Sequence, residues 1–193
     1  MDFNLKRRLK AILELETYAN SIGFAPTCLL LARDILLDER VRMHCQLNLC
    51  TNYGNNLMCP PFLPSVADNR QMLDKYTFAL LLQLQQELDH HDKEFMRQTF
   101  DATARRFGQM AVSLERKAFS DGFRLAMALG AGECKLCENC VIQKGERNCI
   151  NPGTARPSME GMGINVVRTF AAAGLELVFT TARLTVAGIL LID

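Results

Sequence analysis

The amino-acid sequence predicts an α+β fold, with a mixed or antiparallel sheet of about five strands packed against three to four helices. Amphipathic segments with apolar residues at helical spacing alternate with short apolar runs of strand length. Two cysteine-rich stretches lie between them, in sequence rich in turn-forming residues. The chain has 193 residues, of which 49% are hydrophobic and 22% charged, so it is able to bury a core. We expect a single domain over residues 1–193, with both cysteine-rich loops at one edge of the sheet.

The first part of the chain predicts one helix and one strand. Apolar and charged residues alternate with helical spacing over residues 5–22, and Gly23 and Pro26 end that helix. The apolar run at 28–32 is typical of a short buried strand, which the run at 35–37 extends after a break.

The middle of the chain predicts two helices around a central strand. Ser65, followed three residues later by Asp68, is typical of a helix start and predicts a helix over 66–75. The aromatic and apolar run at 76–84 predicts a central strand. Residues 92–119 carry methionine, phenylalanine and leucine at helical spacing, so we expect a long helix there whose apolar face belongs to the core.

The last part of the chain predicts three strands and a helix. The apolar run at 123–129 predicts a strand that leads into a cysteine-rich stretch. A helix is expected at 164–173, ended by a glycine. Two further strands are expected at 175–179 and 184–192, joined by a turn at 181–183.

One cysteine-rich stretch has three cysteines separated by two-residue gaps, and a fourth follows after a longer interval: Cys134, Cys137, Cys140 and Cys149. Two-residue gaps let successive thiolates turn toward one metal centre, and this series is typical of a ferredoxin-like iron–sulfur site. Structural zinc sites more often have two separated Cys-x-x-Cys pairs or include histidine. The spacing therefore predicts a metal centre and favours a 4Fe–4S cluster, with zinc as the alternative. A set of ordinary buried thiols is the least favoured interpretation.

The other stretch has three cysteines, Cys45, Cys50 and Cys59, within a loop that asparagine and glycine residues fold back on itself. Pro60 and Pro61 stiffen the chain after the third cysteine. We interpret this loop as a second centre.

Three histidines and one cysteine are less favoured as ligands. His44 adjoins Cys45, but an exposed loop histidine is the more favoured interpretation. His90 and His91 lie in polar sequence and are expected to be solvated. Cys28 lies in an apolar run far from the other cysteines, so we expect it in the core.

The spacing leaves the partner of Cys149 open. It either completes the set with Cys134, Cys137 and Cys140 or serves the three-cysteine loop, because in two-cluster ferredoxins the distant cysteine ligates the other cluster. In the first case one iron of the second centre has no protein thiolate, and His44, water, substrate or a partner's residue would hold it. Four charged residues are candidates to line such an open site, although local salt bridges are the favoured role for them: Arg40, Arg42, Arg156 and Glu160.

Taken together, these motifs resemble a widespread family. They comprise the segment from Cys45 to Pro61, the run from Gly130 to Cys140, Cys149, and Ala155–Ile164, and the resemblance extends from about Cys28 to the end of the chain. The family is a domain of unknown function, found mostly in archaea and anaerobic bacteria and described as predicted metal-binding proteins. The resemblance implies a cysteine-ligated metal or iron–sulfur site and an anaerobic setting, and it brings no assigned reaction.

Composition excludes several function classes. The net charge of +1 gives no electrostatic basis for binding nucleic acid or a membrane surface. We find no signal peptide, no apolar run long enough to span a bilayer, no phosphate-binding glycine loop and no Ser/His/Asp set. We therefore expect a cytoplasmic protein whose clustered cysteines serve metal or redox chemistry.

Three functions stay open at this point. Electron transfer with a redox partner protein, or service as a subunit of a redox complex in anaerobic metabolism, is favoured first. An enzyme that uses an open iron comes second. A zinc-stabilised interaction module comes third. The sequence carries no signal for oligomeric state.

Overall fold

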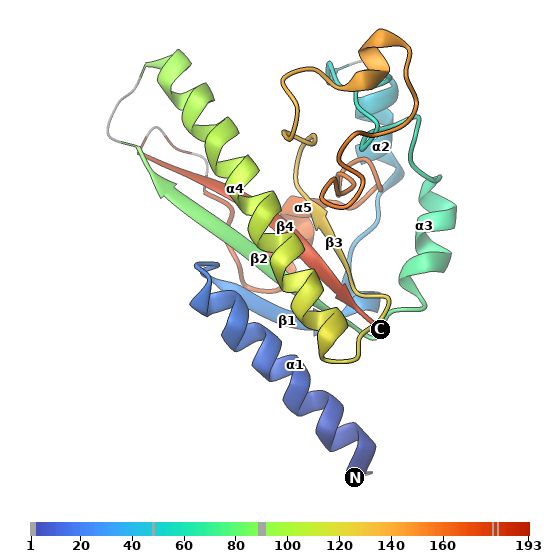
Figure 1. Ribbon diagram of the computed structural model, residues 1–193, viewed down its shortest axis with the longest axis vertical. Helices are drawn as coiled ribbons and strands as arrows, with labels where there is room; N and C mark the ends of the chain where they lie inside the picture. Colours follow the sequence, from blue (N-terminus) through green and yellow to red (C-terminus); the bar gives the residue numbers. More distant parts are fainter. Residues whose placement is uncertain (1–2, 48, 89–91, 179, 181) are drawn as a thin grey trace.

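The computed structural model describes residues 3–47, 49–88, 92–178, 180 and 182–193 (Figure 1). In chain order its helices and strands are α1 (Phe3–Ser21), β1 (Thr27–Leu31), α2 (Glu39–Gln46), α3 (Val66–Leu73), β2 (Phe78–Glu87), α4 (Lys93–Ser120), β3 (Met127–Gly130), α5 (Val166–Ala172) and β4 (Arg183–Ile192). Two short 3-10 helices, Ala32–Asp34 and Val141–Lys144, complete the described elements. The protein is therefore α+β, as the sequence predicts.

The four strands form one open antiparallel sheet in the order β1-β2-β4-β3. β2 and β4 pair along their whole length, from Phe78 opposite Ile192 to Glu87 opposite Arg183. Both central strands are mostly buried, from Ala79 to Leu84 in β2 and from Leu184 to Ile192 in β4, because both faces of the sheet are covered. Alternate side chains of β2 therefore enter two separate core layers.

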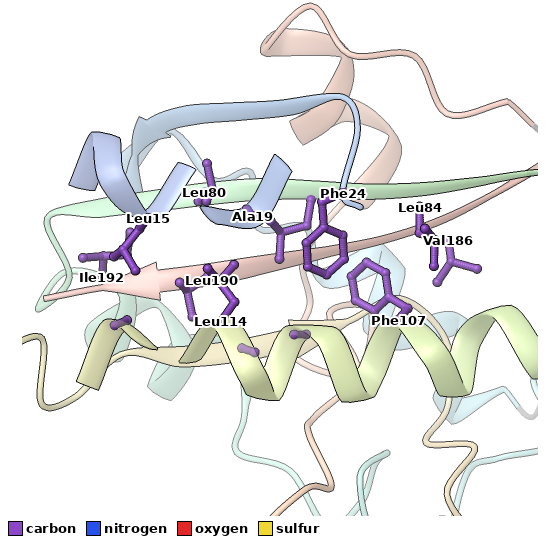
Figure 2. Close-up of a cluster of buried hydrophobic side chains, with 14 of the residues drawn as sticks. Leu15, Ala19, Phe24, Leu80, Leu84, Phe107, Leu114, Val186, Leu190 and Ile192 are labelled. Carbon is purple, nitrogen blue, oxygen red and sulfur yellow. The ribbon is translucent and has the colours of Figure 1, made fainter. Parts of the chain in front are cut away.

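One core layer lies between the sheet and the helices α1 and α4, as Figure 2 shows. Leu15 from α1, Leu114 from α4 and Leu190 from β4 are fully buried there. The rings of Phe24 and Phe107 meet edge to face, with 5.1 Å between their centroids. This layer explains the helical spacing of apolar residues in α1 and α4.

The other core layer covers the opposite face of the sheet. It contains Leu81 and Ile189 from the central strands, Phe170 from α5, and Met159 and Ile164 from the segment before α5. Because Met159 and Ile164 are buried in this layer, the segment that follows the last cysteine is held firmly against the sheet.

The cysteine-rich segments lie together beyond β3, the edge strand, on the side of the sheet where α2 and α3 are found (Figure 1). β3 ends at Gly130, which forms a parallel bridge with Ser158. The Ser158 amide donates to the carbonyl of Met58 at 3.0 Å, so the two cysteine-rich segments are joined through the backbone. The expected position of both loops at one edge is confirmed.

Several predicted elements need correction. Residues 175–178 are not a strand, and the expected strand count falls from about five to four; Phe179 lies outside the described residues. Their polar groups bond elsewhere: the Val178 amide donates to the Thr185 hydroxyl, and the Glu176 carbonyl accepts from the Gln83 side chain. The strand expected at 123–129 is shorter, and residues 35–37 do not extend β1. The described residues form five α-helices, against the three to four expected, because the sequence pattern does not predict α2.

Among the described residues, we find no helix with both the length and the hydropathy needed to cross a bilayer.

Candidate metal centres

Four cysteines from the segment after β3 line one small cavity. Cys134, Cys137, Cys140 and Cys149 surround a space of about 20 Å³, together with residues of the other cysteine-rich segment. Cys149 therefore lies with the first three cysteines, and the alternative placement beside Cys45, Cys50 and Cys59 is not what the fold shows. We call this set the four-cysteine site.

Amide groups point at the sulfur atoms of the four-cysteine site. The backbone N–H of Leu57 donates to Cys140 Sγ at 3.5 Å. Asn151 donates twice, from its side chain to Cys137 Sγ at 3.3 Å and from its backbone to Cys149 Sγ at 3.4 Å. Donors of this kind favour the thiolate over the thiol and tune a bound metal centre.

Without a bound metal, the surroundings of Cys134 favour its protonated thiol. Burial raises the pKa of the Cys134 thiol, and an N–H of Leu136 opposes that shift. The three neighbouring cysteines raise the pKa further, because several thiolates in one cavity repel each other. A bound metal reverses this balance, since coordination deprotonates thiols outright.

The other three cysteines line a much larger space. Cys45, Cys50 and Cys59 face a cavity of about 610 Å³, and we call them the three-cysteine site. Cys45 lies in the last turn of α2 and not in a loop. This helix begins after Asp38, whose side chain caps it by accepting from the Arg40 amide. The predicted loop therefore begins only after Gln46.

The three-cysteine site is anionic when its thiols ionise. Burial is the main cause that raises the pKa of the Cys59 thiol to about 12, and that residue is only 6% exposed. Four nearby groups add to the shift: Cys50, Glu133, Cys45 and Glu160. Burial and Cys50 likewise raise the pKa of the Cys45 thiol, against the opposing charge of Arg42. As in the four-cysteine site, only a cation makes the ionised state favourable.

Two of the four charged residues considered from the sequence line this cavity. They are Arg40, whose guanidinium makes two hydrogen bonds to Asp38 at 2.9 and 2.8 Å, and Glu160. His44 also lies in the cavity wall, on the exposed side of α2.

The other two charged residues do not line it and hold the fold. Arg42 donates to the backbone carbonyls of Leu63, Pro64 and Gly161. Arg156 forms an ion pair with Glu115 of α4, and its Nε lies 2.8 Å from that carboxylate. Both residues have structural roles, as the sequence favours, but neither forms the expected local salt bridge: Arg42 binds carbonyl groups, and the partner of Arg156 lies on α4.

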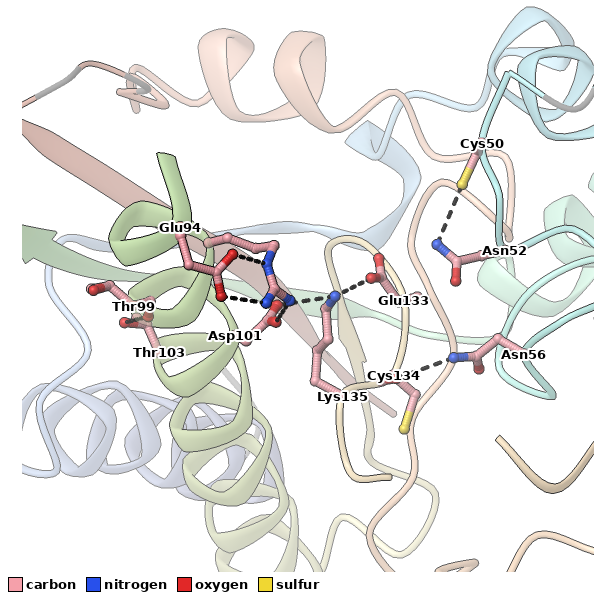
Figure 3. A network of polar contacts seen from close by, with 11 residues as sticks. Cys50, Asn52, Asn56, Glu94, Thr99, Asp101, Thr103, Glu133, Cys134 and Lys135 are labelled. Atoms are coloured by element: carbon pink, nitrogen blue, oxygen red, sulfur yellow. Dashed lines mark hydrogen bonds and ion pairs between the residues drawn. The ribbon is translucent and has the colours of Figure 1, made fainter. Parts of the chain in front are cut away.

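A short segment of chain links the two sites. Asn56 donates from its side chain to the carbonyl of Cys134 at 3.1 Å (Figure 3), and Leu57 donates to Cys140 Sγ. Two residues after Leu57 the chain reaches Cys59 of the three-cysteine site, so the α-carbons of those two residues lie at most about 7 Å apart. The sites are therefore neighbours.

The remaining candidates lie apart from both cavities. Cys28 packs against the core layer of α5, and burial raises the pKa of its thiol. Its position agrees with the expected core role. His90 and His91 lie outside the described residues. Among the residues that the structure describes, no three His, Cys, Asp or Glu side chains converge on a position for one metal ion.

Sequence reasoning missed the residues that surround the cysteines. Asn56 precedes Cys59 by three residues and Asn151 follows Cys149 by two, and the sequence pattern assigns neither a role at the sites. Glu133 also went unnoticed; it lines the larger cavity and is ion-paired with Lys135, which also meets Asp101 of α4 at 3.0 Å (Figure 3). An asparagine two residues from a predicted ligand, such as Asn151, can be recognised in the sequence as a candidate donor to sulfur. The pairing of Lys135 with α4 cannot, because it depends on the fold.

Comparison with known proteins places this architecture in a family. The family model described as "Predicted metal-binding protein (DUF2284)" matches residues 28–192. No curated protein and no solved structure matches the chain. The match spans both cysteine sites and all four strands except the first residue of β1, so the chain belongs to this family of predicted metal-binding proteins of unknown function.

Proposed function

We propose that the protein binds two 4Fe–4S clusters, one at each cysteine site, and carries electrons for a redox partner protein or within a redox complex. The observation that carries this proposal is the four-cysteine site: four cysteines line one small cavity, and amides donate to the sulfurs of three of them. Bound clusters would supply one-electron chemistry with little rearrangement of the protein.

The residues fit a cluster better than a single ion. Thiolates are soft ligands that suit both zinc and iron–sulfur clusters, so ligand type alone does not separate them. A cluster distributes its thiolates over several irons and does not require them to converge on one point, as a tetrahedral zinc site does. Amide donors to sulfur are also a known means of setting the reduction potential of a cluster.

The link between the sites supports electron transfer. Leu57 contacts a sulfur of the four-cysteine site, and Cys59 belongs to the three-cysteine site. One short segment therefore contributes to both centres, and the path between them stays inside the protein. The small volume of the four-cysteine site, about 20 Å³, leaves little room for an exogenous ligand, which suits a centre that only passes electrons.

A second candidate function is catalysis at the three-cysteine site. The specific observation that favours it is the difference in volume, about 610 Å³ beside three cysteines against about 20 Å³ beside four. Three protein thiolates would leave one iron of a cluster open to another ligand, and the larger cavity has room for one. In this alternative the four-cysteine site supplies electrons to the reaction.

Metal analysis of protein purified without oxygen tests the proposal. We expect a brown protein with about eight iron and eight sulfide per chain, because each cluster holds four of both. A colourless protein that contains only zinc would instead establish a zinc-stabilised module and refute both iron–sulfur functions.

Cyanide or a small thiol, added to the reduced protein, distinguishes the two candidates. A shift in the electron paramagnetic resonance signal of one cluster indicates the open site, and no shift in either supports the electron carrier.

A further inference from the structure

We propose that Glu160 is the fourth protein ligand of the three-cysteine site, binding the open iron through Oε1. This inference deepens the proposed function and depends on a cluster being bound there. Three cysteines leave one iron of a cluster without a protein thiolate. In the four-cysteine site, Cys149 supplies the fourth thiolate.

The Glu160 carboxylate is fixed in the wall of the cavity. Its Oε2 accepts from the Gly132 amide at 2.9 Å and from the Ser158 hydroxyl at 2.9 Å. Ser158 is itself held, since it forms a bridge with Gly130 and its hydroxyl accepts from the Gly161 amide at 3.1 Å. Both donors engage the same oxygen, so Oε1 stays available to a ligand in the cavity. Metal-binding carboxylates are typically oriented in this way by hydrogen bonds to the other oxygen.

Charge in the cavity supports a cation beside Glu160. Arg40 is occupied by Asp38, and Lys135 is shared between Glu133 and Asp101. Among the described residues, Glu160 forms no ion pair with a lysine, arginine or histidine, and it lines the same cavity as Cys45, Cys50 and Cys59. A bound cation would neutralise this unpaired carboxylate together with the thiolates that the cation coordinates.

Other residues of the cavity are less suited to the role. His44 lies on the exposed side of α2, and nothing described orients its ring. Glu133 is committed to Lys135. A carboxylate oxygen is a harder ligand than a thiolate and binds iron less firmly. The Glu160 ligand would therefore be exchangeable, which suits a site that also takes an external ligand.

The variant Glu160→Gln tests this role, because glutamine has the same shape and its carbonyl oxygen still accepts from Gly132 and Ser158. Clusters are first counted by iron and sulfide, and electron paramagnetic resonance is then recorded with and without cyanide. We expect the signal of one cluster to change, cyanide to bind that cluster at least about tenfold more tightly, and the other signal to stay as in the wild type. The matched control changes Glu14, an exposed carboxylate of α1 that lines neither cavity and pairs with Lys10: Glu14→Gln should leave both signals and the cyanide affinity unchanged.

The variant Glu160→Cys separates a ligand from a structural residue. A thiolate at this position would restore a four-thiolate centre, so the cluster should be retained and cyanide should no longer shift its signal. A purely structural role predicts that cysteine performs worse than glutamine, because it is too short to accept both hydrogen bonds.

Two outcomes would overturn the inference. If the wild type carries two clusters and Glu160→Gln reproduces its signals and cyanide affinity, Glu160 only anchors the loop, and the proposed function stands. If the wild type carries no cluster, the proposed function fails, and this inference fails with it.

Discussion

Gly188, in the centre of β4, is the position where one methyl group should cause the greatest damage to the sheet. A Cβ atom added there would lie 2.5 Å from the carbonyl oxygen of Leu129 in β3 and 2.5 Å from the ring of Phe107 in α4. Both distances are shorter than real Cβ contacts, and neither neighbour moves easily. The Leu129 oxygen is backbone in the paired strand, and Phe107 is only 3% exposed within the core.

The substitution Gly188→Ala should therefore lower the free energy of unfolding by about 3 kcal/mol, the upper part of the usual range for overpacking. Urea denaturation followed by circular dichroism measures this as a lower midpoint at unchanged slope. Because β3 leads directly into the four-cysteine site, we also expect that site to hold less iron. A loss smaller than about 0.5 kcal/mol, within the range of ordinary surface changes, would refute the packing argument.

Gly108→Ala is the matched control. Gly108 follows Phe107 in α4, but an added Cβ would have nothing within 4 Å. Alanine in the interior of a helix is favoured over glycine by about 1 kcal/mol, so this variant should be more stable than the wild type. The two glycine substitutions should change the free energy of unfolding in opposite directions. This difference separates steric crowding at Gly188 from a general sensitivity to substitution near the sheet.

Four further substitutions test the sites and their support. Cys149→Ser should alter the resonance signal of the four-cysteine site alone, whereas Cys28→Ser should leave both signals intact. Asn151→Ala removes an amide donor to Cys137 and should lower the reduction potential of that centre in redox titration, because donors to sulfur stabilise the more negative reduced state. Arg156→Ala leaves the partly buried Glu115 without its cation and should destabilise the protein by about 2 kcal/mol in urea, and an unchanged midpoint would contradict this.

The three-cysteine site and the four-cysteine site differ in which chain segments supply their residues. In the four-cysteine site all ligand candidates come from one segment, residues 134–149, and the other segment contributes amides. In the three-cysteine site Cys45 comes from a helix, and Gly132, Glu133 and Glu160 complete the wall from the far segment. Cysteine spacing along the chain therefore predicts the residues of the four-cysteine site but not those that complete the three-cysteine site.

The sequence by itself determined most of the helices and the central strands. The helix 93–120 and the strand 78–87 have apolar patterns that only one kind of element satisfies, and Ser65 with Asp68 marks a helix start by its local hydrogen bonds alone. The two-residue gaps between Cys134, Cys137 and Cys140 likewise bring these cysteines to one cavity. In each case residues close in sequence interact directly, so no knowledge of distant partners is needed.

Only the tertiary structure decided which cysteines Cys149 lies beside, whether residues 175–178 form a strand, and which partners the charged residues have. Cys149 lies beside Cys134 because the intervening chain turns back through a 3-10 helix, which no periodicity predicts. Residues 175–178 do not pair as a strand. The Glu176 carbonyl and the Val178 amide form hydrogen bonds with side chains instead. Arg156 and Glu160 stand four residues apart, yet one supports α4 and the other faces the large cavity. Their surroundings come from segments distant in the chain, and that is why the sequence leaves them open.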